Sequence, residues 1–536
     1  MSDTSLLAKW FLTVAERGND FTSIDQRHDN GMAWTSGNTV VVHVDGAGYY
    51  RRLAELFAGL SAGDHVWFTD WEGDADERLT DQGPTVAEAF ESLERRGVDV
   101  CGLLWRSHPT QAGFAAQDNS ELAGDVNEDN GQIELDERVR RGGSHHQKTV
   151  IIHREGGADV AFVGGIDLCH GRRDDADHLG DPQAYAMDEC YGPTPAWHDA
   201  QLELTGPAVD DVSWSFRERW DDPNSLDGRS IVRALRRRVA GQARKLPPLP
   251  RQDPRSSGDG PHHVQVLRTY PFRRPPYGFA PEGERSVARG YLKALARARR
   301  LVAIEDQYLW SGVAADALAD ALRAHPDLLV VVFVPRYPDE AGGLSGAANR
   351  GARNQAIATL TQAGGERVAV YDLENREGSP IYVHAKVCIL DDVWLEVGSD
   401  NVNRRSWTHD SEMACAVIDE RRDPRAPTDP GGLGDGARVL ARDTRLTLWR
   451  EHLGRQPGDD GDLVDPQEGF DALREGAEAL DIWVRAGRLG RRPPGQLRPH
   501  EGRPVPGWMR PLASVAYHLV VDPDGRSLAQ RRSHAY

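Results

Sequence analysis

Two stretches decide the fold of this 536-residue chain: SHHQKTVIIHREGGADVAFVGGIDLCHGRRDD (residues 144–175) and YVHAKVCILDDVWLEVGSDNVNRRSWTHDSE (residues 382–412). Each reads as a strand, a turn, a second strand and then a loop that contains glycine. Each also begins with a histidine and a lysine two positions apart. Because the part of the chain that can carry chemistry occurs twice, the sequence predicts a duplicated architecture.

The segments that precede these stretches repeat a second pattern, in the order strand, helix, strand. In the first half they are HVWFTDWEG, TVAEAFESLERRG and VDVCGLLWR, and in the second half RRLVAIEDQYLW, GVAADALADALRAHP and DLLVVVFVPR. Near-continuous apolar strands that alternate with amphipathic helices are typical of sheets covered on both faces. We therefore predict an α/β fold of two similar α/β/α sandwich lobes, with mixed sheets and one shared active site at their interface.

A proline-rich segment, KLPPLPRQDPRSSGDGPHH (residues 245–263), separates the two halves and reads as a linker. Near the C-terminus, VAYHLVVDPDG (residues 515–525) has the composition of a strand, which we expect to pair with the second lobe. The predicted units are an N-terminal lobe (1–245), the linker (246–263), a C-terminal lobe (264–455) and a C-terminal extension (456–536).

Composition narrows the classes of function. The net charge of −19 disfavours binding to nucleic acid, because so acidic a chain repels phosphate backbones. No stretch approaches the roughly 18 to 20 apolar residues of a membrane span, and charges come too early for a secretory signal. The five cysteines form no C-x-x-C pair, which argues against a disulfide scaffold or a cysteine-based zinc site. We expect a cytoplasmic monomer without a metal or another cofactor.

The repeated histidine and lysine suit the chemistry of a phosphate diester. Residues i and i+2 of a strand point to the same face, so His384 and Lys386 project together, and His146 and Lys148 have the same spacing. Lysine ammonium groups offset charge on phosphoryl oxygens, and histidines exchange protons near neutral pH. One neutral imidazole can attack phosphorus while the other, protonated, releases the alcohol.

The glycine loops supply candidate phosphate-binding groups. In the second half, Gly398 permits a close backbone approach, Ser399 offers a hydroxyl and Asn401 an amide. The first-half loop, residues 164–167, ends at Asp167 and has fewer donors. The two halves are therefore not expected to bind phosphate equally.

Two carboxylates follow the histidines at equal spacing. Asp174 lies 28 residues after His146, and Glu412 lies 28 residues after His384. A carboxylate that accepts the Nδ1 proton of a histidine fixes its tautomer and supports the imidazolium. We therefore predict that Asp174 orients His146 and that Glu412 orients His384.

These residues resemble the phospholipase D superfamily, whose signature is H-x-K-x4-D followed by a G-[SG]-x-[ND] loop, present twice in each active site. The second copy here matches throughout: His384, Lys386, Asp391, Gly398, Ser399 and Asn401. The segments FVGGIDLCHGRRD, WHDAQLELTGPAV and IEDQYLW are similar to the eukaryotic-type branch of the family. The resemblance covers roughly residues 35–455. It departs at His153, where the family has aspartate.

The resemblance implies hydrolysis of glycerophospholipids such as phosphatidylcholine to phosphatidic acid and a free headgroup. In this scheme His146 attacks phosphorus to give a phosphohistidine, and His384 protonates the departing alcohol and then activates water; a primary alcohol in place of water gives transphosphatidylation. The nucleophile is assigned by analogy, and the two histidines could exchange roles. Asp391 completes the catalytic motif, Lys148, Lys386, Ser399 and Asn401 hold the phosphoryl oxygens, and contact with a membrane is peripheral.

Three other functions use the same residues. A cardiolipin-synthase-like phosphatidyltransferase has the same motifs, although such enzymes carry N-terminal membrane spans. A nuclease is disfavoured by the net charge. The alternative of another class is a degenerate, non-catalytic protein that binds phosphorylated ligands, and His153 is the one feature in its favour.

Overall fold

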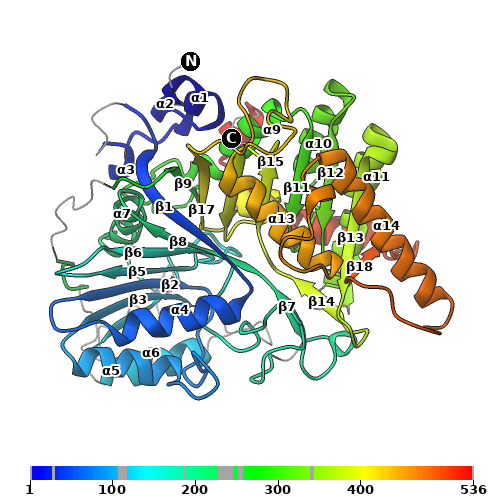
Figure 1. Ribbon diagram of the computed structural model, residues 1–536. Helices are drawn as coiled ribbons and strands as arrows, with labels where there is room; N and C mark the ends of the chain where they lie inside the picture. Colours follow the sequence, from blue (N-terminus) through cyan, green and yellow to red (C-terminus); the bar gives the residue numbers. More distant parts are fainter. Residues whose placement is uncertain are drawn as a thin grey trace.

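Two β-sheets, each flanked by helices, make up the computed structural model (Figure 1). It describes residues 3–26, 31–106, 117–128, 131–185, 187–226, 246–250, 258–338, 343–533 and 536. The first sheet, coloured blue to cyan-green, comes from the N-terminal half of the chain, and the second, green to yellow, comes from the C-terminal half.

The first sheet contains a parallel and an antiparallel part. Its strands are β1 (Thr35–Val44), β2 (His65–Asp70), β3 (Asp99–Trp105), β4 (Gln132–Asp136), β5 (Thr149–His153), β6 (Val160–Gly164) and β8 (Ala200–Thr205). They lie in the order β4-β3-β2-β5-β6-β8-β1, with β2 parallel to β3 and β3 parallel to β4. The other neighbours are antiparallel.

The second sheet repeats this topology. Its strands are β9 (His262–Tyr270), β11 (Leu301–Glu305), β12 (Leu329–Phe333), β13 (Val368–Glu374), β15 (Val387–Leu390), β16 (Trp394–Gly398) and β17 (Glu412–Asp419). They lie in the order β13-β12-β11-β15-β16-β17-β9, again with three parallel strands followed by antiparallel ones. The predicted duplicated α/β fold with mixed sheets is confirmed.

Helices cover both faces of the two sheets. The first sheet carries α4 (Gly46–Ala58), α5 (Val86–Arg95) and α6 (Asp118–Glu128), and the second carries α9 (Ser286–Arg297), α10 (Gly312–Ala324) and α11 (Gly343–Gly364). On the opposite faces, α7 (Ala208–Trp220) packs on strands of both sheets, and α13 (Val439–Leu453) and α14 (Pro466–Arg485) pack on the second sheet. One core cluster joins residues of both sheets, such as Leu202 and Val397, so the lobes share apolar packing that excludes water.

Local signals account for the ends of several helices. The hydroxyl of Thr85 accepts from the backbone N–H of Glu88, and the Glu88 carboxylate accepts from the Thr85 N–H, a capping box that starts α5. A cap of this kind typically stabilises a helix by about 1 kcal/mol. The helix then buries one apolar stripe, which includes Phe90 and Leu93, against the first sheet.

Short elements complete the fold. They are α1 (Asp3–Trp10), α2 (Val14–Arg17), α3 (Ser23–Gln26), β7 (Ala196–His198), β10 (Glu284–Arg285), β14 (Pro380–Val383), α12 (Arg404–Thr408), β18 (Leu497–Pro499), α15 (Arg510–Ala516) and α16 (Leu528–Arg532). β7 of the first half pairs in parallel with β14 of the second, with His198 opposite Val383. This pairing ties the two halves together directly before His384.

The C-terminal extension differs from the prediction. Residues 515–525 do not form a strand: α15 is followed by a π-helical turn over Tyr517–Val521. β-Branched and aromatic residues favour strands, but packing decides here, because Ala513 and Val521 are buried with Trp310 and α11 residues. The strand that pairs with the second lobe is β18, which lies against β13.

The division into lobes, linker and extension stays a prediction. Part of the linker, residues 251–257, lies outside the described residues. Beyond it, β9 begins at His262, within the predicted linker. The helices of the described residues include none with the length and apolar character needed to cross a bilayer.

Candidate active site

Both histidine–lysine pairs lie at one edge of the sheets. His146 and Lys148 are in the extended segment that enters β5, and His384 and Lys386 are in the segment between β14 and β15. Because β5 and β15 run antiparallel to β2 and β11, they begin where the parallel strands end. In α/β folds this carboxyl edge is where ligands bind.

The first motif is bound to the second half of the chain. Nδ1 of His146 lies 2.8 Å from Oε2 of Glu412, at the start of β17, although 266 residues separate them. The backbone N–H of His146 donates to the Ser411 carbonyl (2.9 Å), and the Ser144 N–H donates to the Asp410 carboxylate (2.9 Å). The imidazole is therefore held by groups from the other lobe.

The second motif is bound to the first half in the reciprocal way. Nδ1 of His384 lies 2.7 Å from Oδ2 of Asp199. The backbone N–H groups of His384 and Ala385 both donate to the His198 carbonyl, at 2.8 and 3.1 Å. Each histidine thus has its Nδ1 fixed by a carboxylate of the opposite half, which leaves Nε2 for the reaction. The two motifs form one site at the interface between the lobes.

The prediction that Asp174 orients His146 is wrong. The Asp174 carboxylate accepts backbone N–H groups of Trp197 (2.8 Å) and Gly180 (3.1 Å), and so it fixes a loop. Equal spacing in the sequence misled here, because the chain between β6 and β8 is longer than its counterpart between β16 and β17.

Glu412 does contact a catalytic-site histidine, but the partner is His146, not the predicted His384. The partner of His384 is Asp199, which directly precedes β8 as Glu412 begins β17. The two carboxylates are therefore structural equivalents. The signal that could have found Asp199 is its place at the entry to the strand after the loop, inside the segment WHDAQLELTGPAV.

Two buried lysines lie beside the histidines. The ammonium of Lys148 donates to the His146 carbonyl (3.1 Å) and lies 3.4 Å from Asp167. The ammonium of Lys386 donates to the His384 carbonyl. Burial, opposed by the charge of Asp199 and helped by that of Lys148, lowers the pKa of Lys386 to about 8. Two cations held this close favour an anion between them.

The structure corrects the roles expected for Ser399 and Gly398. The Ser399 hydroxyl donates to Oε2 of Glu412 (2.6 Å), so it supports that carboxylate instead of facing a phosphate. Gly398 lies against β17, where an added Cβ would meet the Cβ of Ala414 at 2.4 Å. At the position equivalent to Ser399, an added Cβ on Gly165 would lie 2.1 Å from Asp199 Oδ1. Each loop is thus fitted to the carboxylate beside it.

Asp167 and Asn401 end the two loops and differ in what they offer. Asp167 accepts backbone N–H groups of Trp71 and Glu72 (3.2 and 3.4 Å) and faces Lys148. A carboxylate would repel phosphate, so Asp167 acts on the lysine, contrary to its predicted role. Asn401 is buried, and its Oδ1 has no hydrogen-bond partner among the described residues.

Asp391 lies at the far end of β15, away from the histidine and lysine that share its motif. Its carboxylate accepts the backbone N–H groups of Arg299, Arg300 and Leu301, each at 2.8 Å, and so fixes the start of β11. The predicted catalytic role is therefore replaced by a structural one. His153 occupies the same place in the first sheet, where it contacts Asp159 (2.9 Å).

Burial and charge set the protonation of the histidines. Burial, helped by the charge of Lys386, lowers the pKa of His384 to about 3. Burial and both lysines hold the pKa of His146 well below its ordinary value. Without a bound anion, both imidazoles are neutral at pH 7.

The two orienting carboxylates differ in charge. Burial, helped by the charge of Asp410, raises the pKa of Glu412 to about 8. For Asp199, burial acts in the same direction, but the His384 ring and the Lys386 ammonium outweigh it and hold the pKa at about 2. Asp199 is therefore the better support for an imidazolium.

Aromatic and basic side chains that the motifs do not include complete the site. The Trp197 ring lies 4.8 Å from the His384 ring, centroid to centroid, and the Arg172 guanidinium stacks on Trp197 at 3.9 Å. Trp71 lies edge-on to His146 at 6.3 Å. Arg172 is buried, and its positive charge also lowers the pKa of His384. Arg172 belongs to the GRRD segment of the sequence, but the spacing of that segment did not predict that Arg172 lies at the site.

Comparison with known proteins identifies this arrangement. The family model described as Phospholipase D matches residues 117–269 and 348–478, together more than half of the chain. The chain belongs to the phospholipase D superfamily. One related protein is phospholipase D alpha 2 of rice, which is 26% identical over 76% of this chain and 64% of the rice protein. Another is phospholipase D beta 1 of Arabidopsis thaliana, which is 24% identical over 80% of this chain and 49% of that protein. This chain thus spans half to two thirds of their length.

A solved structure agrees in fold with this phospholipase D-superfamily chain. The phosphatidylserine synthase of Haemophilus influenzae Rd KW20 superimposes with a TM-score of 0.50 at 14% sequence identity, over 84% of this chain and 94% of the synthase. At such low identity the match establishes the shared architecture.

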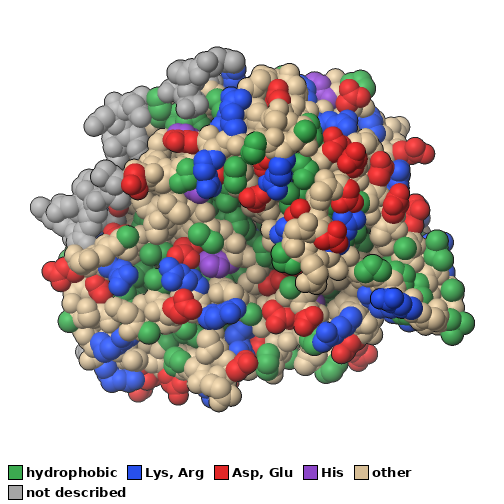
Figure 2. All heavy atoms as spheres, in the orientation of Figure 1, with side chains coloured by type: hydrophobic (Ala, Val, Ile, Leu, Met, Phe, Trp, Pro, Cys, Tyr) green, Lys and Arg blue, Asp and Glu red, His purple; other side chains and the backbone are tan. Residues whose placement is uncertain are grey.

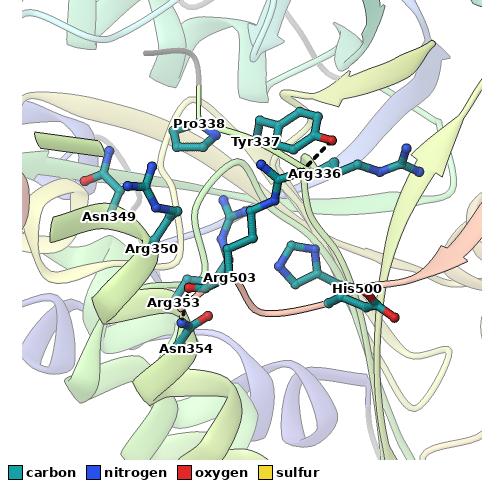
Figure 3. Close-up of a pocket in the computed structure, with 10 residues that line it drawn as sticks. Arg336, Tyr337, Pro338, Asn349, Arg350, Arg353, Asn354, His500 and Arg503 are labelled. Carbon is teal, nitrogen blue, oxygen red and sulfur yellow. Dashed lines mark hydrogen bonds between the residues drawn. The ribbon is translucent and has the colours of Figure 1, made fainter. Parts of the chain in front are cut away.

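Figure 3 shows an arginine-rich pocket in the second lobe. Its basic lining residues are Arg336, Arg350, Arg353, His500 and Arg503. Arg503 stacks on Tyr337 at 4.2 Å and donates to its hydroxyl (2.9 Å). The Tyr337 N–H donates to the hydroxyl of Tyr191, whose ring contacts Tyr382, a neighbour of His384. The pocket is therefore linked to the surroundings of His384 through Tyr337, Tyr191 and Tyr382, and two of its basic groups, Arg336 and His500, are paired with Asp372 (2.7 and 3.0 Å).

Proposed function

We propose that this protein is a phospholipase D-type phosphodiesterase that hydrolyses glycerophospholipids such as phosphatidylcholine to phosphatidic acid and a free headgroup. The observation that carries the proposal is the reciprocal pairing of His146 with Glu412 and of His384 with Asp199, with both lysines alongside. This arrangement provides a nucleophile, a general acid and charge for the phosphoryl oxygens without a metal ion.

In the first step, Nε2 of His146 attacks phosphorus and the bond from phosphorus to the headgroup oxygen breaks. Glu412 accepts the Nδ1–H of His146. The raised pKa of Glu412 leaves its side chain largely uncharged at pH 7, so it does not favour a protonated His146 ring. A neutral ring is the form that can act as nucleophile. The phosphodiester brings a negative charge beside the lysines and so raises the pKa of His384. His384, supported by ionised Asp199, then gives its Nε2 proton to the departing alcohol.

In the second step, water attacks the phosphohistidine from the side that the headgroup left. His384 accepts the proton of water, and the bond between phosphorus and His146 breaks to release phosphatidic acid. A primary alcohol in place of water yields a phosphatidyl alcohol by the same route. Lys148, Lys386 and Asn401 hold the phosphoryl oxygens.

The competing functions find less support. On the face shown in Figure 2, basic and acidic side chains of the described residues are interspersed, and a nuclease needs a broad basic surface. His153 was the one feature in favour of a non-catalytic protein. It lies at the end of β5 that is remote from His146, so it leaves the reacting groups intact.

The proposed substrate places the reaction at a membrane surface. A glycerophospholipid is presented at a membrane surface, so the proposed activity requires peripheral contact with a bilayer. A cytoplasmic, monomeric protein stays our prediction for this chain.

The test is an incubation with phosphatidylcholine vesicles and a primary alcohol, without added metal. Choline, phosphatidic acid and phosphatidyl alcohol are measured for the wild type, His146→Ala and His384→Ala, with His325→Gln, a partly exposed histidine outside the site, as the control. We expect all three products from the wild type and the control, and rates at least about 10⁴-fold lower from the alanine variants. A phosphohistidine trapped during brief exposure should be absent from His146→Ala. Lack of products from the wild type would refute the lipid activity.

A further inference from the structure

A second cluster of titratable side chains lies behind the active site. Asp45 precedes α4, His178 is in the loop fixed by Asp174, His198 ends β7, and Glu451 is in the last turn of α13. One potential ligand atom of each of these four side chains lies within 4.8 Å of the corresponding atoms of the other three. The two imidazoles are fully buried, and the two carboxylates are 4% and 11% exposed.

The short separations inside the cluster join nitrogen to oxygen. Nδ1 of His198 lies 3.0 Å from the Asp45 carboxylate and 3.3 Å from Oε1 of Glu451. Nε2 of His178 lies 3.2 Å from the same Oε1. Zinc binds nitrogen and oxygen ligands at about 2.0–2.2 Å in a tetrahedron, so two of its ligands are about 3.3 Å apart. The observed separations match this spacing.

The opposite nitrogen of each histidine is fixed by a second acceptor. Nε2 of His198 lies 2.8 Å from the Glu305 carboxylate, whose other oxygen is 2.7 Å from His452. Nδ1 of His178 lies 3.1 Å from the Trp197 carbonyl. A histidine that binds a metal typically donates its other N–H to a carboxylate or a carbonyl in this way. Both rings thus have the surroundings of metal ligands.

Backbone strain is concentrated at the same place. Six non-glycine residues in the described part of the chain have positive φ, and two of them are Asp45 (62°) and His178 (50°). Such conformations cost on the order of 1–3 kcal/mol each and persist where other interactions require them. A ligand that needs both side chains aimed at one point is such a requirement.

We propose that Asp45, His178, His198 and Glu451 bind one divalent transition-metal ion, with Zn²⁺ the best match to two imidazoles and two carboxylates. The two carboxylates neutralise the charge of the ion. In the metal-free protein each of these rings faces oxygen acceptors through both nitrogens, so each carries two protons. Binding of the ion releases one proton from each ring to solvent.

The metal has a structural role next to the catalytic groups. His198 directly precedes Asp199, and its carbonyl accepts the backbone N–H groups of His384 and Ala385. An ion that fixes the His198 ring therefore fixes the segment that orients His384. The proposal is independent of the substrate, because in the described residues the hydrogen bonds of the His178 and His198 rings go to groups other than the two motif lysines and histidines.

The test uses the full-length, untagged protein, stripped with a chelator and dialysed against Zn²⁺. Bound metal is measured by mass spectrometry and the thermal midpoint by calorimetry. Asp45→Asn and Glu451→Gln remove ligands, while His43→Gln removes one member of a His–Glu pair outside the cluster (3.0 Å) and serves as the matched control. We expect one equivalent of zinc in the wild type and the control, at least tenfold weaker binding in both ligand variants, and a higher thermal midpoint with zinc.

Two results would overturn the proposal. One is a wild type that retains less than about a tenth of an equivalent of zinc and shows no change in thermal midpoint, since protons alone then occupy the cluster. The other is loss of zinc in His452→Gln with full binding in Glu451→Gln, which would move the ion to the set formed by His198, Glu305 and His452. If a ligand variant does not fold, the wild-type measurement still decides.

Discussion

The Glu412 carboxylate and the His146 ring are 2.8 Å apart and belong to opposite halves of the chain. The same relation, reversed, joins Asp199 of the first half to His384 of the second at 2.7 Å. Because each half supplies the orienting group for the histidine of the other, neither half can hold a working histidine alone. The duplication therefore produces one site and not two.

The crosswise pairs predict a specific pattern of coupling. Asp199→Asn should lower kcat by on the order of 10³- to 10⁴-fold, with little change in KM, because it removes the charge that supports the His384 imidazolium. Glu412→Gln should lower kcat by a smaller factor, because burial already leaves Glu412 largely uncharged at pH 7. Once His384 is replaced by alanine, Asp199→Asn should not lower kcat further. Glu412→Gln should likewise not lower kcat further in a His146→Ala background. Steady-state kinetics of these double mutants check the pairing. Coupling of Glu412 to His384 instead would contradict it.

The sequence predicted the fold and the two His–Lys pairs that the structure brings together, but not the carboxylate partners of the histidines. Topology followed from elements that occur twice, and the His–Lys pairs carry an i, i+2 signature that is local. The orienting contact is not local: it depends on which strand end of one lobe meets which segment of the other. Spacing from each histidine therefore identified Glu412 as an orienting group but assigned it to the wrong ring, and it selected Asp174 where the structure has Asp199.

Two other errors have the same cause. Ser399 matches a loop motif, but whether its hydroxyl faces phosphate or a carboxylate depends on Glu412, which lies on the next strand. Asp391 matches the family signature, but the four residues between Lys386 and Asp391 form β15 and carry it to the other end of the sheet. A motif in sequence thus combines residues that act at different places.

Lys386 makes substrate binding dependent on pH. Its pKa is lowered to about 8, so the ammonium is charged below that pH and neutral above it. KM should therefore rise as the pH passes through 8. An arginine keeps its charge at every accessible pH, so Lys386→Arg should abolish the rise of KM above pH 8. KM measured from pH 6 to 9.5 tests this, with Lys293→Arg, which lies outside the site, as the control. An unchanged rise of KM above pH 8 in Lys386→Arg would assign it to another group.

Gly165 gives a steric test of the Asp199 contact. A methyl group at this position would lie 2.1 Å from Asp199 Oδ1, so Gly165→Ala must displace the carboxylate from His384. We expect kcat to fall by about 10²-fold, the effect of a misplacement of roughly 1 Å, while the thermal midpoint changes little. Gly124→Ala, where nothing lies within 4 Å of the added Cβ, should leave kcat unchanged. Equal kcat values for the two variants would show that Asp199 does not need its observed position.

His153 and Asp391 should affect stability and not the chemical step. Asp391→Asn leaves one oxygen for three backbone donors, which should lower the free energy of unfolding by about 1–3 kcal/mol. His153→Asp restores the family residue but places a carboxylate beside Asp159 and removes the contact with Ser213 (3.2 Å), so it should also destabilise. Both variants should keep kcat within about threefold at a temperature where they are folded, because neither residue reaches the histidines.

Denaturant unfolding and kinetics measured on the same samples separate the two effects. A rise in kcat for His153→Asp would mean that the first motif is catalytically impaired by its histidine, and a large loss in Asp391→Asn without loss of stability would return Asp391 to the reaction.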